Sequence, residues 1–280
     1  MPTVCVFPGQ GSQAKGMGEG LFERFEALTA EADSILGYSL KELCLEDPNE
    51  QLNQTQFTQP ALYAVSAMAY LARQEDGGEA PAFLAGHSLG EYAALFAAGA
   101  FDFATGLRLV AKRGEIMSKA QGGGMAAVLG LDPDGIRTAL DANGFDTIDI
   151  ANYNSPKQTV ISGLKDDIVK AESAITEAGA KRYVVLNVSG AFHSRYMSDA
   201  ADEFSKTLAE ATFADLTIPV IANLTGKPYE AGVFTEYLQK QINHSVRWTD
   251  TVMYLKEQGE VEFEEVGPGK VLTALIRQIR

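Results

Sequence analysis

Short apolar runs alternate with amphipathic stretches along most of this 280-residue chain. Short apolar runs are typical of buried strands, whereas apolar positions recurring every three or four residues are typical of helices packed on a sheet. A strand is predicted at Thr3–Phe7, followed by the glycine-rich turn Pro8–Ser12. Helical stretches are predicted over Leu21–Ile35 and over Pro60–Arg73, whose proline suits a first helical turn. The alternation predicts an α/β fold.

A second predicted strand, Ala82–Gly86, runs directly into the sequence Gly-His-Ser-Leu-Gly at 86–90, and a helix is predicted over Glu91–Gly99. A G-x-S-x-G between a strand and a helix is the pattern of a nucleophile elbow, in which two glycines permit a tight turn that exposes the serine oxygen. The helix N-terminus beside Ser88 offers free backbone N–H groups to an oxyanion. An ordinary glycine-flanked turn is the alternative, because the motif alone is weakly specific.

The stretch from residue 122 to 189 has a distinct order of predicted strands and helices. In order they are a strand at Met125–Leu129, a helix at Pro133–Asn143, strands at Thr147–Asn152 and Thr159–Ser162, a helix at Asp166–Ala178 and a strand at Tyr183–Val188. The order βαββαβ predicts a ferredoxin-like subdomain, with three glycines at its front. We expect it to be an insertion, residues 124–190, into a larger subdomain made of residues 1–123 and 191–280. Further short strands are predicted at Ile218–Asn223 and Glu262–Val266.

A serine nucleophile needs a base, and the chain has only three histidines. His87 is next to Ser88, and neighbours on such a turn point in different directions, so we expect it to pack or bond under the turn. His244 lies in a polar loop and is expected to be solvated. His193, just after the last strand of the insertion, is the best candidate for the general base, although a lone histidine is also often structural.

An arginine interrupts the apolar face of the helix predicted over Phe103–Lys119. At 100° per residue the apolar arc contains Leu107, Leu109, Val110, Ala111, Gly114, Ile116 and Met117. Arg113 falls within this arc, whereas the other charged residues cluster on the opposite side. A buried guanidinium needs a partner. Two interpretations stay open: a structural salt bridge with an internal acid, or a site for a ligand carboxylate, which arginine grips through paired hydrogen bonds. The second implies an acyl group with a free acid end.

Composition narrows the function classes. The 37 acidic and 23 basic residues give a net charge of −14, which argues against nucleic acid and an anionic membrane surface as partners. Two cysteines, Cys5 and Cys44, fit a reducing cytosol, and the longest apolar stretch, Tyr92–Phe101, is too short to span a bilayer. No signal-peptide pattern or metal-ligand spacing is present. We therefore expect a cytoplasmic protein without a metal.

Landmarks spread over nearly the whole chain resemble the malonyl-CoA:acyl-carrier-protein transacylase family. They are Phe7–Gln13, Gly86–Glu91, Arg113-Gly114, Asn154–Pro156, Gly190–His193, Gln241 with Val246–Trp248, and Glu265–Lys270. The family includes the enzyme of fatty-acid synthesis and free-standing, trans-acting acyltransferases of polyketide assembly lines, and overall similarity favours the latter. The resemblance implies an α/β-hydrolase-like large subdomain with an inserted ferredoxin-like small one and the active site between them.

The resemblance also assigns catalytic roles. Ser88 would be the nucleophile and His193 its base, with Gln241 orienting His193 in place of the acid of a hydrolase triad. The backbone N–H groups of Gln10 and Leu89 would form the oxyanion hole.

Three further residues would bind the substrate. Arg113 would hold the free carboxylate of the acyl group, and Asn154 would face the cleft from the small subdomain. Phe192 would fill the space that a methyl on the malonyl α-carbon needs. One methyl group is worth about 1–3 kcal/mol in a pocket, so malonyl should be preferred over methylmalonyl without absolute exclusion.

The expected reaction is a ping-pong transfer of malonyl from malonyl-CoA to the phosphopantetheine thiol of an acyl carrier protein, by a monomer without a further cofactor. The alternatives are an acyl-thioester hydrolase, such as an editing thioesterase, on the same scaffold, and a non-catalytic docking domain. Arg113 and Gln241 argue against the hydrolase, because an enzyme for neutral acyl chains has no use for a buried cation. The combination of Ser88, His193 and Arg113 argues against the docking domain.

Overall fold

Two β-sheets organise the chain, and the structure, a computed structural model, describes residues 1–280. The first sheet is parallel, with the strand order β7-β2-β1-β8. Its strands are β1 (Thr3–Phe7), β2 (Phe83–Gly86), β7 (Val220–Ile221) and β8 (Glu262–Glu265). The central strand β1 is almost wholly apolar and buried, as expected of a strand covered on both faces.

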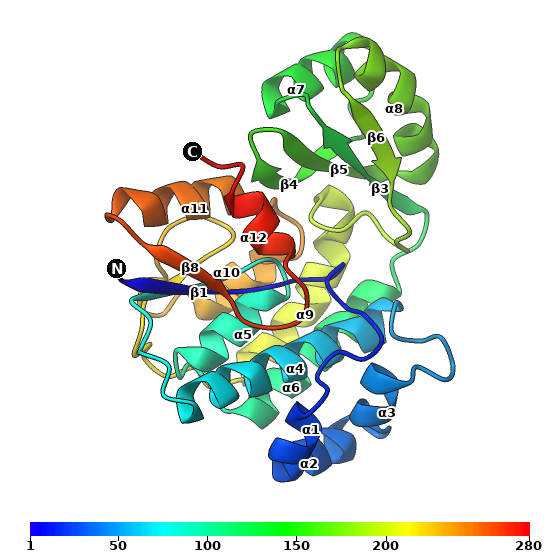
Figure 1. Ribbon diagram of the computed structural model, residues 1–280. Helices are drawn as coiled ribbons and strands as arrows, with labels where there is room; N and C mark the ends of the chain where they lie inside the picture. Colours follow the sequence, from blue (N-terminus) through cyan, green and yellow to red (C-terminus); the bar gives the residue numbers. More distant parts are fainter.

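Helices cover both faces of the parallel sheet. The layer on one face is built mainly from α4 (Thr55–Glu75), α5 (Gly90–Ala97), α6 (Phe103–Ser118), α9 (Ser198–Glu210) and α10 (Phe234–Gln241). The other face is covered by α11 (Trp248–Glu257) and α12 (Val271–Ile276). Figure 1 shows the sheet between these two layers. The short helices α1 (Leu21–Arg24), α2 (Glu26–Leu36) and α3 (Leu40–Leu45) lie at the end remote from the second sheet.

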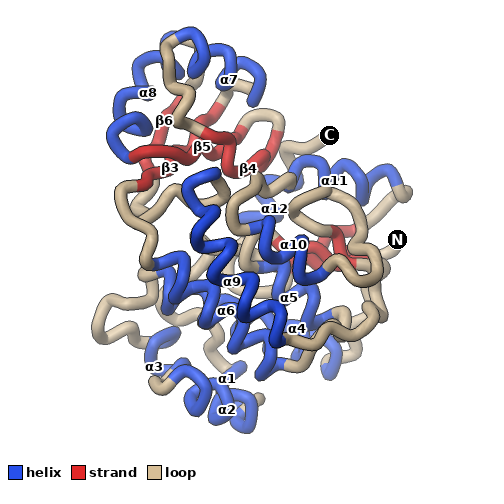
Figure 2. Tube along the Cα trace, turned by 180° about the vertical axis from the view of Figure 1, so that it is seen from behind, coloured by secondary structure: helices blue, strands red, loops and turns tan.

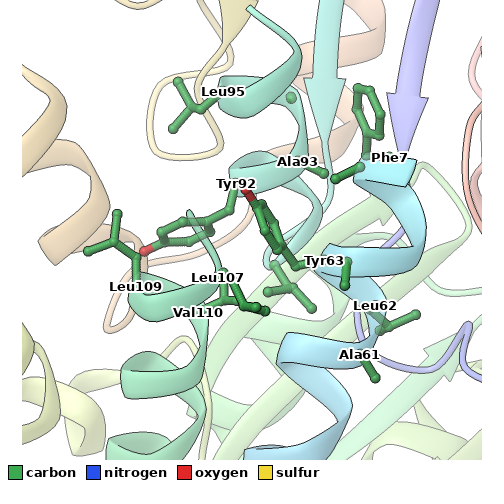
Figure 3. Close-up of a cluster of buried hydrophobic side chains, with 14 of the residues drawn as sticks. Phe7, Ala61, Leu62, Tyr63, Tyr92, Ala93, Leu95, Leu107, Leu109 and Val110 are labelled. Carbon is green, nitrogen blue, oxygen red and sulfur yellow. The ribbon is translucent and has the colours of Figure 1, made fainter. Parts of the chain in front are cut away.

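Alternation along β1 divides the core between these layers. Cys5 and Phe7 point into the larger cluster, whereas Val4 and Val6 point toward α11 and α12. Figure 3 shows the larger cluster where α4, α5 and α6 meet, with Tyr63 and other apolar side chains packed between the helices.

The second sheet is antiparallel, with the strand order β4-β5-β3-β6. Its strands are β3 (Gly123–Leu129), β4 (Asp149–Ser155), β5 (Gln158–Leu164) and β6 (Arg182–Val185), and its helices are α7 (Pro133–Ala142) and α8 (Lys165–Glu177). The six predicted elements are therefore all present, although β6 ends three residues earlier and β4 three residues later than predicted. The two helices pack on one face of this sheet around a separate apolar cluster. Figure 2 shows the same unit from behind.

Two contacts fix how the antiparallel unit is attached. A Cβ on Gly123 would lie 2.2 Å from the backbone nitrogen of Ala191, so the chain entering the unit and the chain leaving it pass in close contact. Backbone hydrogen bonds join Val246 to Ala151 and Tyr153, which ties β4 to the segment before α11. A single-turn 3-10 helix, Arg195–Met197, then leads the chain into α9.

The largest departures from the predicted helix bounds occur in two helices. The predicted helix Leu21–Ile35 is interrupted at Phe25, which adopts a non-helical conformation (φ −119°, ψ 53°). Helix α4 begins at Thr55 rather than Pro60, so Pro60 lies inside the helix and not in its first turn. The ring removes one backbone donor there, and burial of most of the side chains from Thr55 to Met68 offsets that loss. None of the helices is long and apolar enough to cross a membrane.

Candidate active site

Ser88 lies on a tight turn between β2 and α5, as the G-x-S-x-G pattern predicts. Its φ of +50° falls in the left-handed region, which a side chain other than glycine occupies only under constraint. Asn223 supplies that constraint: its Oδ1 accepts from the Ser88 backbone N–H at 2.6 Å, and its Nδ2 donates to the Gly86 carbonyl at 2.6 Å. The turn is therefore held from a segment far away in the sequence.

The glycines of this region permit close backbone contact. A Cβ on Gly90 would lie 2.1 Å from the carbonyl oxygen of Phe7, and a Cβ on Gly9 would lie 2.4 Å from the carbonyl oxygen of His87. These distances leave no room for a side chain. The turn after β1 and the elbow after β2 are thus in close contact, and Gln10 and Ser88 line the same cavity.

His193 lies within hydrogen-bond distance of the serine. Its Nε2 is 2.8 Å from Ser88 Oγ, and its Nδ1 is 2.8 Å from the backbone carbonyl oxygen of Gln241. Because a carbonyl can only accept, Nδ1 carries the proton and Nε2 presents its lone pair to Ser88. Burial, followed by the positive charge of Arg113, lowers the pKa of His193 to about 3. The imidazole is neutral at physiological pH and free to accept the serine proton.

The contact with Gln241 is made by the main chain. Its side chain bonds elsewhere: Oε1 accepts from Arg113 Nη2 at 2.9 Å, and Nε2 donates to the Ser88 carbonyl at 2.9 Å and to Glu91 Oε2 at 2.5 Å. Gln241 thus orients His193 through its backbone carbonyl and Arg113 through its side-chain oxygen.

Arg113 is buried on α6 beside the serine. Its Nη1 donates to Gln59 Oε1 at 2.7 Å, and its Nη2 lies 3.3 Å from Ser88 Oγ. Tyr92 offers a ring face 5.7 Å from the guanidinium carbon. No Asp or Glu forms an ion pair with it, so the structural salt bridge left open by the sequence is absent. Its hydrogen bonds to side-chain amides go to neutral oxygens, and no carboxylate bonds it directly.

Gln10 and Leu89 line the same cavity as Ser88. Neither backbone N–H donates to another group of the protein. Leu89 directly precedes the first residue of α5, whose N-terminus carries partial positive charge. Two free backbone donors near a serine nucleophile are what stabilisation of an oxyanion requires.

Asn154 and His87 form a pair at the floor of the site. Asn154 Oδ1 lies 2.8 Å from His87 Nε2, and the His87 ring packs against Trp248 with centroids 5.7 Å apart. Burial lowers the pKa of His87. This is the supporting role under the turn that the sequence predicts for His87. His244 is exposed, as predicted.

The site opens into a cavity of about 270 Å³ between the two sheets. Residues 9–12, the elbow and Arg113 line it from the parallel-sheet side, and β3 and β5 line it from the other. Phe192 lies in its wall, 5% exposed. Its other apolar lining includes Met117, Val160 and Leu275. No cluster of three or more His, Cys, Asp or Glu side chains is arranged to hold a metal ion.

Three buried residues of the site escaped the sequence patterns: Gln59, Glu91 and Asn223. Glu91 gave the clearest available signal, because it directly follows the elbow and precedes the apolar stretch Tyr92–Phe101. Gln59 and Asn223 gave none, because a single amide in a helix or after a strand has no distinctive spacing.

A model of the acyl transferase domain matches residues 4–279. The chain belongs to the acyl transferase family. A polyketide biosynthesis malonyl CoA-acyl carrier protein transacylase of Bacillus velezensis is 56% identical over 278 residues, which span 98% of this chain and 96% of the relative. The crystal structure of a malonyl CoA-acyl carrier protein transacylase from Burkholderia pseudomallei has 50% identity and a TM-score of 0.97, and covers 100% of this chain and 98% of that one.

A second solved acyltransferase is a malonyl transacylase in complex with its type II polyketide synthase acyl carrier protein. It is 41% identical, with a TM-score of 0.94 over 100% of this chain and 93% of that one. The similarity to both structures extends over both sheets, so the relative placement of the two units is shared with these acyltransferases.

Proposed function

We propose that this protein transfers a malonyl group from malonyl-CoA to the phosphopantetheine thiol of an acyl carrier protein through a malonyl-Ser88 intermediate. One observation carries the proposal: a buried guanidinium without an acidic partner, that of Arg113, lies 3.3 Å from the Ser88 hydroxyl. Such a cation selects an acyl group that ends in a carboxylate. The names of the relatives, which specify malonyl transfer to an acyl carrier protein, support the same substrate and partner.

In the first half-reaction His193 Nε2 accepts the Ser88 proton as Oγ bonds to the thioester carbon. The backbone N–H groups of Gln10 and Leu89 hold the oxyanion, and removal of one such donor typically lowers the rate about 10²–10³-fold. The carbon–sulfur bond then breaks, and the coenzyme A sulfur takes the proton from His193. The carbonyl of Gln241 keeps Nδ1 protonated throughout.

In the second half-reaction the phosphopantetheine thiol gives its proton to His193 and attacks the malonyl ester. The bond to Ser88 Oγ breaks, and Oγ recovers the proton. The exchange of one thioester for another is redox-neutral and isoenergetic to a first approximation, so the proposed reaction needs malonyl-CoA as a substrate and no further cofactor.

Two residues of the cavity would select the acyl group. Arg113 would bind the malonyl carboxylate, with its orientation fixed by the amide oxygens of Gln59 and Gln241. Phe192 would occupy the space beside the malonyl α-carbon and disfavour methylmalonyl. We assign Asn154 a supporting role, since its Oδ1 bonds His87 under the elbow.

We further propose that residues 1–123 and 191–280 form an α/β-hydrolase-like subdomain and that residues 124–190 form a ferredoxin-like one. The parallel sheet with helices on both faces supports the first assignment. The strand order β4-β5-β3-β6, produced by the element order βαββαβ, supports the second. The active site would then lie between the subdomains.

The pathway follows from similarity rather than from the chemistry of the site. The relative from Bacillus velezensis is named for polyketide biosynthesis, which supports a trans-acting acyltransferase of a polyketide assembly line. We propose that the protein is a cytoplasmic monomer. The net charge of −14 means that an acidic carrier protein would have to meet a local basic patch.

Intact-protein mass spectrometry after mixing with malonyl-, methylmalonyl- or acetyl-CoA tests this function. Wild-type protein should gain a malonyl adduct, and Ser88→Ala should gain none. Arg113→Ala should lose the malonyl adduct or gain an acetyl adduct in its place, because the buried charge that selects the carboxylate is gone.

A hydrolase would give a different result in the same experiment. Rapid release of free malonate without an adduct would mean that water is the acceptor, and the thioesterase function would replace the transferase. Addition of a carrier protein bearing phosphopantetheine completes the test: the adduct should disappear from Ser88 and appear on the carrier.

A further inference from the structure

Glu91 is a buried acid directly beneath the catalytic serine, and the proposed mechanism does not use it. It lies in the first turn of α5 and is 1% exposed. Its Oε1 accepts from the Tyr229 hydroxyl at 2.5 Å and from the Asn223 backbone N–H at 3.3 Å, and its Oε2 accepts from Gln241 Nε2 at 2.5 Å. Three hydrogen-bond donors around a buried carboxyl favour its ionised form.

The Gln241 amide links this carboxylate to Arg113. Its nitrogen donates to Glu91 and to the Ser88 carbonyl, while its oxygen accepts from Arg113 Nη2. A reversed amide would set the NH₂ group against the guanidinium and the oxygen against two acceptors, so only one orientation satisfies all three partners. The amide therefore turns its positive NH₂ end toward the Glu91 carboxylate and its negative oxygen end toward Arg113.

Glu91 is also the acid whose charge acts on the arginine. Burial disfavours both charged forms: it lowers the pKa of Arg113 and raises the pKa of Glu91, while the attraction between the two opposite charges acts against both shifts. The two do not form a direct ion pair. In the empty site the positive charge of Arg113 is thus balanced by Glu91 at a distance, with the Gln241 side chain between the two charged groups.

We propose that Glu91 is the counter-charge of Arg113 in the empty site and that it takes up a proton when the malonyl carboxylate binds to Arg113. This inference rests on the proposed function. The incoming carboxylate neutralises Arg113 from the cavity side, and two buried anions beside one buried cation are unfavourable. The proton comes from solvent and is held on Oε1, where the Tyr229 hydroxyl is the one neighbour that can accept as well as donate.

The pH range follows from the environment of the carboxyl. Burial raises the pKa of Glu91 to about 7, against the hydrogen bonds from Tyr229 and Gln241, which lower it. The titratable groups facing it are Arg113 from α6, Tyr229 from the segment after β7 and Tyr92 beside it on α5. Burial raises the pKa of both tyrosines, so neither changes charge near neutrality.

The sign of the effect on binding is fixed by this linkage. Below pH 7 Glu91 is protonated, and Arg113 offers its charge to the ligand unopposed. As the pH rises through 7, Glu91 ionises and competes with the malonyl carboxylate, so affinity falls. If binding raises the proton affinity of Glu91 tenfold, the Kd for malonyl-CoA rises about sevenfold between pH 6 and pH 8.5. Glu91 would thus keep the malonyl group from being held too tightly for onward transfer.

Isothermal titration calorimetry of malonyl-CoA binding to the Ser88→Ala protein tests the inference without turnover. Titrations at pH 7 in buffers of different ionisation enthalpy count the protons taken up. The same tenfold change predicts an uptake of about 0.4 proton for each malonyl-CoA bound. Malonamyl-CoA, in which a neutral amide replaces the carboxylate, is the matched control and should bind with no such uptake, so the coenzyme A phosphates are accounted for.

Two double variants identify the group. Ser88→Ala/Glu91→Gln should bind malonyl-CoA without proton uptake and with a Kd that no longer rises between pH 6 and pH 8.5. Ser88→Ala/His193→Ala should retain the uptake, which separates Glu91 from the histidine even if the Glu91→Gln protein does not fold. If Glu91 had only a structural role, the Glu91→Gln substitution would lower the stability of the protein but would leave the number of protons taken up on malonyl-CoA binding unchanged.

The possible results distinguish a failure of the Glu91 proposal from a failure of the proposed function. Malonyl-CoA binding without proton uptake, or uptake that is lost with His193, would overturn the role of Glu91 and leave the proposed function standing. No binding of malonyl-CoA at any pH would overturn the proposed function, and the counter-charge role with it.

Discussion

Replacing Asn223 with alanine should disable the nucleophile without touching any group that contacts substrate. Asn223 is 1% exposed and bonds both ends of the elbow turn, the Ser88 amide and the Gly86 carbonyl. The left-handed conformation of Ser88 is strained by about 1–3 kcal/mol and persists because its surroundings enforce it. The alanine variant removes that enforcement.

The magnitude follows from the two hydrogen bonds. Each buried group left without a partner costs about 1–3 kcal/mol, and water reaches the partly exposed Ser88 turn, so we expect a loss of about 2–4 kcal/mol. At about 2–4 °C for each kcal/mol, a loss of about 2–4 kcal/mol should lower Tm by about 4–16 °C. A displacement of the serine oxygen on the order of 1 Å should slow acylation about 100-fold.

Rapid-quench mass spectrometry of malonyl-Ser88 formation measures the rate, and thermal denaturation measures the stability. Asn143→Ala is a matched control, because its side chain bonds the Ala139 carbonyl at the end of α7, far from the elbow. It should acylate at the wild-type rate. If Asn223→Ala loses stability as expected yet acylates Ser88 within threefold of the wild-type rate, Asn223 supports the fold and does not position the nucleophile.

Two further predictions concern the base and the acyl selectivity. Because burial lowers the pKa of His193 to about 3, the acylation rate constant at saturating malonyl-CoA should be constant from pH 6 to pH 8. A base of ordinary pKa would instead halve the rate near pH 6.5, and such a midpoint would refute the assignment. Phe192→Leu should raise kcat/KM for methylmalonyl-CoA relative to malonyl-CoA about tenfold, in line with about 1–3 kcal/mol for one methyl. An unchanged ratio, measured by competition between the two thioesters, would place the methyl elsewhere in the cavity.

The sequence indicated the elements that depend on local pattern. Strand β1 has its predicted bounds, and the six elements of the antiparallel unit appear in the predicted order. The errors fall where a local signal is ambiguous. Pro60 is typical of a first helical turn, yet tertiary burial extends α4 five residues before it.

The candidate site was predictable where residues sit in a distinctive local context. Ser88 was indicated by the glycines on either side of it, and Arg113 by its place on an apolar helical arc. Both signals depend on spacing within one element. His193 had weaker support, because only the small number of histidines in the chain narrowed the choice.

The remainder of the site depends on contacts between distant segments. Ser88 and His193 are 105 residues apart, and Ser88 and Asn223 are 135 apart, so no local pattern records either hydrogen bond. The role of Gln241 toward the histidine is carried by its backbone carbonyl, which every residue type possesses.

The sequence by itself therefore determined the α/β class, the elbow and the buried cation, because hydrophobic periodicity and turn chemistry act over a few residues. Only the tertiary structure decided what faces that cation. It placed amide oxygens around Arg113 and set Glu91 on the far side of Gln241. The net charge around a buried group depends on every charged and polar residue that folding brings near it. Those residues are distant in the sequence, so local sequence patterns do not reveal them.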